Sequence, residues 1–151
     1  MVGTRLPVIL LLLIACFLPP SVHAADISNV KVLSCYDGDT CRVDLPRHLF
    51  ADDIAYEFFG ENISVRIGRV QIPDIRGRCK KEKDLAIQAR DLVLQTLAAA
   101  ESVTLKEIER GPPFRIAARV LADGQDVSTL LIQQKLAVPY GLGRKTKDWC
   151  E

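Results

Sequence analysis

The chain has 151 residues, with 20 lysine and arginine residues against 19 aspartate and glutamate residues. This length is enough for one domain with one hydrophobic core. The near-neutral charge excludes a protein that holds nucleic acid through its overall electrostatic field, so an anionic ligand has to be bound by a local basic cluster. Outside the N-terminal segment the sequence has no repeat and no long apolar run, and we expect no transmembrane span in the mature domain.

Residues 1–24 have the three parts of a secretory signal peptide. Arg5 supplies a positive charge, an apolar run covers residues 8–15, and small residues precede a cut after residue 24. The run is shorter than the roughly 20 residues that a membrane span needs, and Pro19-Pro20 would break the alternative, a buried core helix. We therefore predict a signal peptide over residues 1–24 and an exported domain over residues 25–151, either periplasmic or secreted.

A second processing site lies within the same N-terminal segment. Leu13-Ile14-Ala15-Cys16 resembles a bacterial lipobox. Processing at this site would leave a lipid on Cys16 and tether the chain to a membrane. Cleavage after residue 24 would instead release the domain, so the two routes predict different final locations.

Four of the five cysteines follow the predicted signal peptide: Cys35, Cys41, Cys79 and Cys150. An even number of cysteines in a small exported domain favours disulfides. Zinc is not expected, because no two of these cysteines have the close spacing of a ligand pair. The four cysteines allow three pairings, which the sequence leaves open. We favour Cys35–Cys41, which would face each other across a hairpin with a three-residue loop, together with Cys79–Cys150.

In chain order, the sequence predicts a hairpin, a long loop, a strand, a helix, two strands and a second helix. Asp37-Gly38-Asp39 between two β-rich runs indicates the hairpin turn, and the first helix has an apolar stripe. This order suits an α+β fold that is mainly β, a five-stranded OB-fold barrel with two or three helices. The predicted bounds are strands at 27–36 and 40–45, a loop at 46–62 with Phe50, Tyr56, Phe58 and Phe59 as buried anchors, a strand at 63–70, a helix at 80–100, strands at 102–109 and 114–121, and a helix from 126 or 128 to 136.

Several residues could carry chemistry, and each has a plain structural alternative. Asp37 and Asp39 bring two carboxylates to a hairpin tip, but Asp-Gly is also a favoured turn dipeptide. Arg66 and Arg115 lie on predicted strands, where an arginine is commonly a solvated side chain. A basic run over residues 76–83 is equally typical of a solvated helix start. No one of these features identifies a site by itself.

Together, the order and spacing of these segments resemble the thermonuclease-like (staphylococcal-nuclease-like) family over residues 30–140. The resemblance also extends to residues 60–66 and 75–79, which look like the exported, cysteine-bearing members, and to a closing helix at 130–137. It rests on Asp37-Gly38-Asp39-Thr40, on Val65-Arg66-Ile67 followed by Pro73-Asp74, and on Phe114-Arg115-Ile116 followed by Ala122-Asp123-Gly124.

The resemblance implies a calcium-dependent phosphodiesterase that hydrolyses single-stranded or frayed DNA and RNA, and we expect a monomer. It makes Asp39 a calcium ligand, with Asp37 and Thr40 beside the ion. It makes Arg66 and Arg115 the residues that bind the scissile phosphate. These residue types suit the chemistry, because hard cations take oxygen ligands and guanidinium groups match phosphate oxygens.

Residues 71–74 depart from the family pattern, which reads Asp-Thr-Pro-Glu or Asp-Ala-Pro-Glu, whereas this chain has Gln71-Ile72-Pro73-Asp74. Gln71 would offer calcium a neutral amide oxygen in place of a carboxylate, which predicts weaker binding, although the carbonyl of Ile72 could still coordinate. Asp74 replaces the glutamate that helps to activate the attacking water. Asp74 is one methylene shorter, and a misplacement near 1 Å can cost on the order of 10²-fold in rate.

Three functions follow from these matches and departures. The first is an active exported nuclease with weak or altered metal dependence. The second is an OB-fold module that still binds phosphates or oligonucleotides but cleaves them poorly. The third is a disulfide-stapled structural domain, which would leave Arg66 and Arg115 unexplained. Tyr140 falls where the family places a tyrosine beside the bound nucleotide, and an aromatic residue at a barrel edge is the alternative.

Overall fold

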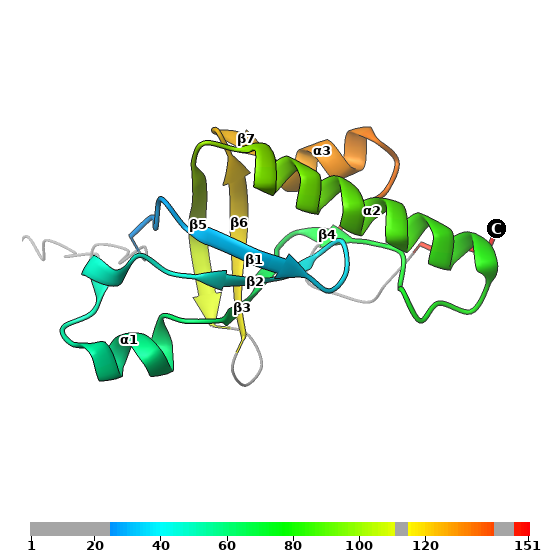
Figure 1. The fold of residues 1–151 in the computed structure, drawn as a ribbon. Helices are drawn as coiled ribbons and strands as arrows, with labels where there is room; N and C mark the ends of the chain where they lie inside the picture. The colour runs from blue at the N-terminus through cyan, green and yellow to red at the C-terminus, as the bar shows by residue number, and fades with distance from the viewer. Residues whose placement is uncertain (1–24, 111–114, 141–146) are drawn as a thin grey trace, which may run out of the picture.

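The computed structural model describes residues 25–110, 115–140 and 147–151, so the predicted signal peptide and the Cys16 processing site lie outside the described residues. The described residues form an α+β fold with three α-helices and a curled mixed sheet (Figure 1). The helices are α1 (Asp53–Phe59), α2 (Lys80–Ala99) and α3 (Val127–Gln133), with a short 3-10 helix at Arg47–Leu49. The strands are β1 (Lys31–Cys35), β2 (Thr40–Asp44), β3 (Ile63–Ile67), β4 (Val70–Gln71), β5 (Val103–Arg110), β6 (Arg115–Ala122), β7 (Gln125–Asp126) and β8 (Val138–Pro139).

The main sheet has the strand order β1-β2-β3-β6-β5, and β7 pairs with β6. Its pairs are antiparallel except for β3 and β6, which run parallel. The sheet curls until the segment before β1 reaches β5, where Ile27 and Leu105 exchange backbone hydrogen bonds of 2.9 and 2.8 Å and Val30 N–H donates to the carbonyl of Val103 at 3.1 Å. β4 and β8 form a separate two-stranded sheet.

The predicted hairpin is confirmed with its three-residue turn. Cys35 lies opposite Cys41 in the β1–β2 register. The backbone N–H of Tyr36 donates to the carbonyl of Thr40 at 2.9 Å, which leaves residues 37–39 as the turn. Because the two cysteines face each other across this turn, the short disulfide that the sequence favoured forms there.

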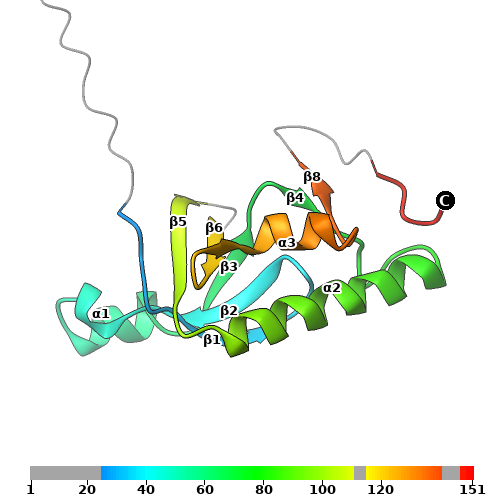
Figure 2. The same cartoon turned by 90° about the horizontal axis from the view of Figure 1, so that it is seen from above.

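The predicted helix at 80–100 is confirmed as α2, and its buried residues lie on one stripe. Ala86, Ala89, Val93 and Leu97 are each at most 4% exposed. They pack towards the curled sheet, and α3 lies beside α2 over the same sheet (Figure 2). α3 begins where the side chain of Asp126 caps it. In the described part of the chain, no helix is long and apolar enough to cross a membrane.

The prediction of a loop at 46–62 is wrong for its second half, where α1 forms. The helix starts because the side chain of Asp52 accepts a hydrogen bond from the N–H of Ala55 at 2.7 Å. Phe58 and Phe59 are not buried anchors, since each is 69% exposed. Periodicity could not reveal this helix, because Ile54, Phe58 and Phe59 face solvent and α1 extends away from the sheet (Figure 1).

The predicted strand at 63–70 is also divided in the structure. β3 ends at Ile67, because Gly68 turns away and Arg69 adopts a positive φ of 66°. The chain then resumes as β4, which pairs with β8 instead of continuing the main sheet. The break directs the residues after β4 towards the β1–β2 turn, and this position places them in the pocket described below.

Candidate functional site

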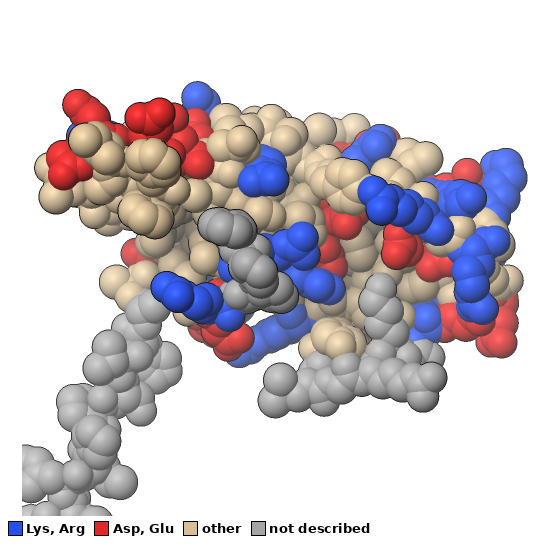
Figure 3. Space-filling view, turned by 90° about the horizontal axis from the view of Figure 1, so that it is seen from below, with Lys and Arg blue, Asp and Glu red and all other residues tan. Residues whose placement is uncertain are grey.

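A pocket of about 120 Å³ opens where the β1–β2 turn, β3, the segment after β4 and the start of β6 come together. Acidic and basic side chains both line it, and Figure 3 shows a face of the molecule on which the two kinds lie side by side. The residues that line the pocket are Asp37, Asp39, Thr40, Arg66, Ile72, Pro73, Asp74 and Arg115. Apart from Pro73, each of them is a site residue predicted from the sequence.

Three constraints hold the turn that carries Asp37 and Asp39. The Cys35–Cys41 disulfide closes the hairpin just outside the turn. Within it, the backbone N–H of Asp39 donates to Oδ1 of Asp37 at 3.1 Å. Gly38 packs against α2, where a Cβ atom at this position would lie 2.7 Å from the Cβ of Ala89. The turn can approach the helix this closely only because residue 38 has no side chain.

Asp39 is the buried acid of the pocket, with 5% of its surface exposed. Its Oδ2 forms an ion pair with Arg66 at 3.0 Å, and its Oδ1 accepts a hydrogen bond from the hydroxyl of Thr40 at 2.8 Å. Burial raises the pKa of Asp39 to about 6; Asp37 adds to this rise, while Arg66 and Thr40 oppose it. Asp39 therefore gains and loses its proton close to neutral pH.

Arg66 and Arg115 reach the pocket from adjacent strands. In the parallel β3–β6 register, Ser64 lies opposite Arg115, and Arg66 lies opposite Ala117. Side chains along a strand alternate between the two faces of a sheet. The offset of two residues therefore places both arginines on the same face. Arg115 is exposed and the side chain of Arg66 is 39% exposed, so a ligand in the pocket can reach both guanidinium groups.

The segment after β4 forms the opposite wall, and Asp74 begins a tight turn there. Oδ1 of Asp74 accepts a hydrogen bond from the N–H of Arg76 at 2.8 Å, and its carbonyl accepts one from Gly77 at 2.8 Å. Glu82, in the first turn of α2, accepts hydrogen bonds from the N–H of Asp74 at 3.3 Å and of Arg78 at 3.0 Å. One helical carboxylate therefore supports both ends of the segment.

Glu82 is a residue of the site that the sequence motifs do not indicate. Its sequence signal is its place three residues after the helix cap Cys79, where a glutamate commonly bonds a free backbone N–H. In this structure the carboxylate bonds N–H groups of the preceding segment. This contact depends on how the segment folds back over the helix, which spacing alone does not indicate.

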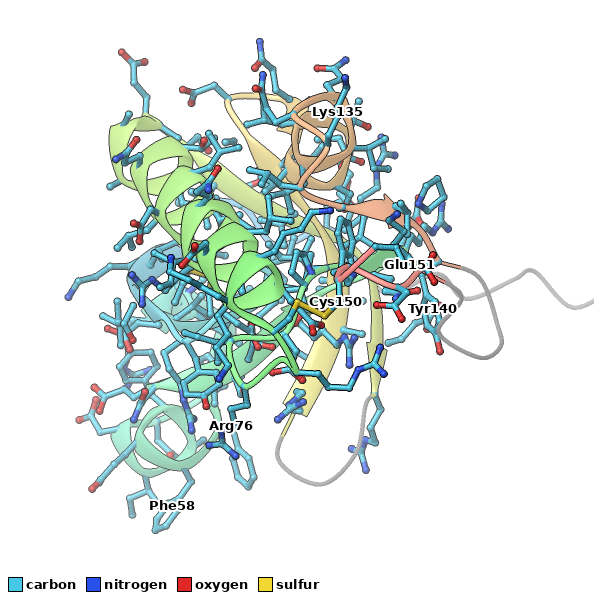
Figure 4. The ribbon with its side chains drawn as sticks, turned by 90° about the vertical axis from the view of Figure 1, so that its right-hand side faces the viewer. Phe58, Arg76, Lys135, Tyr140, Cys150 and Glu151 are labelled. Atoms are coloured by element: carbon cyan, nitrogen blue, oxygen red, sulfur yellow. A yellow bond between two sulfur atoms is a disulfide. The ribbon has the colours of Figure 1, made fainter. Side chains whose placement is uncertain are left out.

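Two of the predicted site residues do not line the pocket among the residues that the structure describes. Gln71 is 3% exposed, and its side-chain amide is bonded to the backbone of Lys147: Nε2 donates to the carbonyl at 2.9 Å and Oε1 accepts from the N–H at 3.4 Å. Tyr140 follows β8, and its backbone N–H donates to the carbonyl of Arg69 at 2.8 Å. Figure 4 shows Tyr140 well apart from Arg76. Their roles towards calcium and the nucleotide remain predictions.

The favoured pairing of the other two cysteines is confirmed as well. The Cys79–Cys150 disulfide joins the start of α2 to residues 147–151, and an ion pair of 2.7 Å between Arg78 and Asp148 supports this contact. Cys79, Glu82 and Cys150 lie close enough to share a metal ion. The disulfide engages both sulfur atoms, however, so this group is a structural junction and not a metal site.

No protein-family model matches the chain, and no curated protein matches it either. The function therefore has to be argued from the pocket. Its guanidinium groups suit a phosphate, and its carboxylates suit a hard cation. The pocket has both kinds of group within one set of walls.

Proposed function

We propose that the protein is an exported phosphodiesterase that hydrolyses DNA and RNA with calcium, at a rate reduced by the residues at positions 71 and 74. The observation that carries the proposal is that Arg66 and Arg115 share one pocket with Asp39 and Asp74. The resemblance of these segments to the thermonuclease-like family, in the same order along the chain, supports this activity. The two disulfides support export, because such bonds persist mainly in oxidising compartments.

In this proposal, Arg66 and Arg115 bind the phosphate of the substrate. Negative charge builds on the phosphoryl oxygens as water attacks, and donors that are already in place stabilise that charge. Two guanidinium groups on one sheet face can reach different oxygens of the same phosphate. Removal of one such donor from an active site typically lowers kcat by about 10²–10³-fold.

The carboxylates of the pocket suit a calcium ion. Asp39 is a buried carboxylate whose raised pKa shows that Arg66 and Thr40 do not fully compensate for its burial, so a cation there would stabilise it. Asp39 and Ile72 would hold the ion, with Asp37 beside it. A bound calcium ion would polarise the phosphate and an attacking water. Gln71 carries no charge, and its side-chain amide already bonds the backbone of Lys147, so position 71 adds no anionic ligand and we expect weak binding.

Asp74 is the candidate for activating the attacking water. It is exposed at the pocket, and its bond to the N–H of Arg76 fixes one oxygen of the carboxylate. Compared with the glutamate of the family pattern, its carboxylate lies closer to the backbone by one methylene. This shorter reach is the physical reason to expect a slow enzyme.

The fold fits the same proposal, because the curled five-stranded order and the Ile27–Leu105 contact suit an OB-type barrel.

The test is cleavage of single-stranded DNA by the purified protein with calcium or with a chelator. We expect calcium-dependent cleavage that falls by about 10²-fold or more in Arg66→Ala. Arg47→Ala is the matched control, because Arg47 is an ion-paired surface arginine of the α1 region outside the pocket. Equal activity of the two variants would contradict the proposed site.

A second candidate function is a binding module that holds nucleic acid without cleaving it. The observation that favours it is the engagement of Gln71 with Lys147 away from the pocket, which weakens the metal half of the site. In this case no calcium concentration would give cleavage. Binding of single-stranded DNA would still weaken as salt increases, and Arg66→Ala and Arg115→Ala would each reduce it.

A further inference from the structure

Beside the pocket, an exposed aromatic ring and a guanidinium group lie against each other. The guanidinium carbon of Arg76 lies 5.8 Å from the centre of the Tyr36 ring. The side chain of Tyr36 lies at the surface, with 55% of the residue exposed. Arg76 is exposed, and none of the ion pairs in the described part of the chain includes it. The pair is therefore accessible to a ligand and is not neutralised.

The two residues come from the segments that supply the carboxylates of the pocket. Tyr36 directly precedes Asp37, and its backbone N–H is bonded to the carbonyl of Thr40 at 2.9 Å. The backbone N–H of Arg76 is bonded to Oδ1 of Asp74 at 2.8 Å. The hydrogen bonds that shape the pocket therefore also fix the backbone of both partners. A ligand held in the pocket has this aromatic and cationic surface next to it.

A second tyrosine–arginine pair shows what a merely structural contact looks like in this protein. Arg47 lies 5.3 Å from the ring centre of Tyr56, but it also bonds the carboxylate of Asp53. Tyr56 packs edge-on against Phe50 at 5.5 Å. That arginine is neutralised and that ring packs against a neighbouring ring. Among the described residues, Arg76 has no carboxylate partner and Tyr36 has no ring partner, so the pair beside the pocket differs from this structural contact in both respects.

We propose that Tyr36 and Arg76 form a stacking subsite for the base of a nucleotide whose phosphate is held by Arg66 and Arg115. The inference rests on the proposed function and adds to it. Aromatic rings bind unpaired bases through their faces, and a neighbouring arginine strengthens the stack and attracts the backbone. A base inside a duplex has both faces covered by its neighbours. The subsite therefore selects single-stranded or frayed nucleic acid.

The experiment compares two probes of equal length and charge in the presence of a chelator: a ten-nucleotide DNA strand and the corresponding strand without bases. Binding is measured by fluorescence anisotropy with the purified, disulfide-bonded protein. We expect wild-type protein to bind the strand with bases about tenfold more tightly. Tyr36→Leu should lose this preference and keep its affinity for the strand without bases, while Tyr36→Phe should retain the preference. Phe58→Leu is the control, since Phe58 is an exposed aromatic residue on α1, outside the pocket.

The possible outcomes separate the subsite from the phosphate site. If wild-type protein binds both probes equally and Tyr36→Leu changes neither affinity, the subsite is wrong and the phosphate site stands. If wild-type protein binds neither probe, the phosphate site fails and the subsite fails with it. If Tyr36→Leu and Phe58→Leu lose the preference equally, general aromatic contacts cause it, and the proposal is overturned.

Discussion

The β1–β2 turn and the segment over residues 72–78 both bring carboxylates to the pocket, but they are held in different ways. The turn is closed by a disulfide that spans 6 positions, and Gly38 packs directly against α2. The segment is held by hydrogen bonds to the side chain of Glu82. It ends at Cys79, whose disulfide spans 71 positions and reaches residue 150.

This difference separates two ways of building a site. In the turn, a disulfide and the close packing of Gly38 against α2 fix the carboxylates. A change there should therefore affect stability and geometry together. In the segment, the disulfide restrains the chain as a whole, while hydrogen bonds within the segment and to the side chain of Glu82 set the local geometry. Geometry should therefore be more easily lost from the segment, with less cost in stability.

The largest effect should come from removing the long disulfide. Chain-entropy arguments give about 4 kcal/mol for Cys79–Cys150 and about 2 kcal/mol for Cys35–Cys41. We expect Cys79→Ser with Cys150→Ser to lower the free energy of unfolding in urea by the larger amount. Cys35→Ser with Cys41→Ser should instead show the larger loss of DNA cleavage at a temperature where both proteins are folded. The opposite ranking in either measurement would contradict this difference between the turn and the segment.

The next largest effect is the pH dependence of the free energy of unfolding that Asp39 causes. Its pKa in the folded protein, about 6, lies above the usual 3.8, so its protonated form favours the folded state. This contribution is fully present below about pH 3.8 and is lost as pH rises through about 6, for a total of about 3 kcal/mol. Urea unfolding of wild-type protein and Asp39→Asn between pH 4 and pH 7 measures it.

Asp39→Asn should be more stable than wild-type protein at pH 7 and inactive in DNA cleavage. The substitution removes a buried charge and keeps an oxygen that can accept the hydrogen bond from Thr40. If both proteins change in stability equally across the pH range, Asp39 does not titrate as described.

Gly38→Ala should lower the free energy of unfolding by about 2 kcal/mol, because the added Cβ would lie 2.7 Å from the Cβ of Ala89 and 3.1 Å from its backbone carbon. Gly68→Ala is the matched control, since its Cβ would lie 3.5 Å from the nearest atom, at ordinary contact distance. If both variants unfold at the same urea concentration, the stability of the protein does not depend on the close approach of Gly38 to α2.

The smallest effect on stability should come from Glu82→Gln, about 1 kcal/mol, because one of its two hydrogen-bond acceptors is replaced by a donor. DNA cleavage should nevertheless fall by about tenfold, since the segment that carries Asp74 loses part of its support. Glu57→Gln on α1 is the control, because this residue is exposed and outside the pocket. A stability loss larger than that of Gly38→Ala would show that the segment contributes more to stability than the close approach of the turn to α2.

Local patterns were sufficient to predict the elements whose side chains repeat with a clear period. The apolar stripe gave α2, and Asp37-Gly38-Asp39 between β-rich runs gave the hairpin with its register. The pocket residues could be predicted because the resemblance supplied their order along the chain, and the structure brings most of them together. Local patterns did not predict α1, because this helix has no buried apolar stripe.

Contacts between distant segments were beyond local patterns. The burial of Gln71 against Lys147 depends on how residues 147–151 fold back against β4. The support from Glu82 depends on the fold of the segment before α2, and the stack of Arg76 on Tyr36 depends on the meeting of two loops. In each case the two contacting residues lie on different segments, and the apolar periodicity of the sequence does not indicate how those segments meet.

The parallel pairing of β3 and β6 also determines when the pocket can first exist as the chain folds. A hairpin such as β1–β2 joins neighbouring residues and can form within microseconds. β3 and β6 are separated by β4, α2 and β5, so their pairing closes a long loop and comes later. Arg66 and Arg115 become neighbours only through that pairing. The proposed phosphate site should therefore form in the last phase of refolding, after the hairpin and the helix have formed.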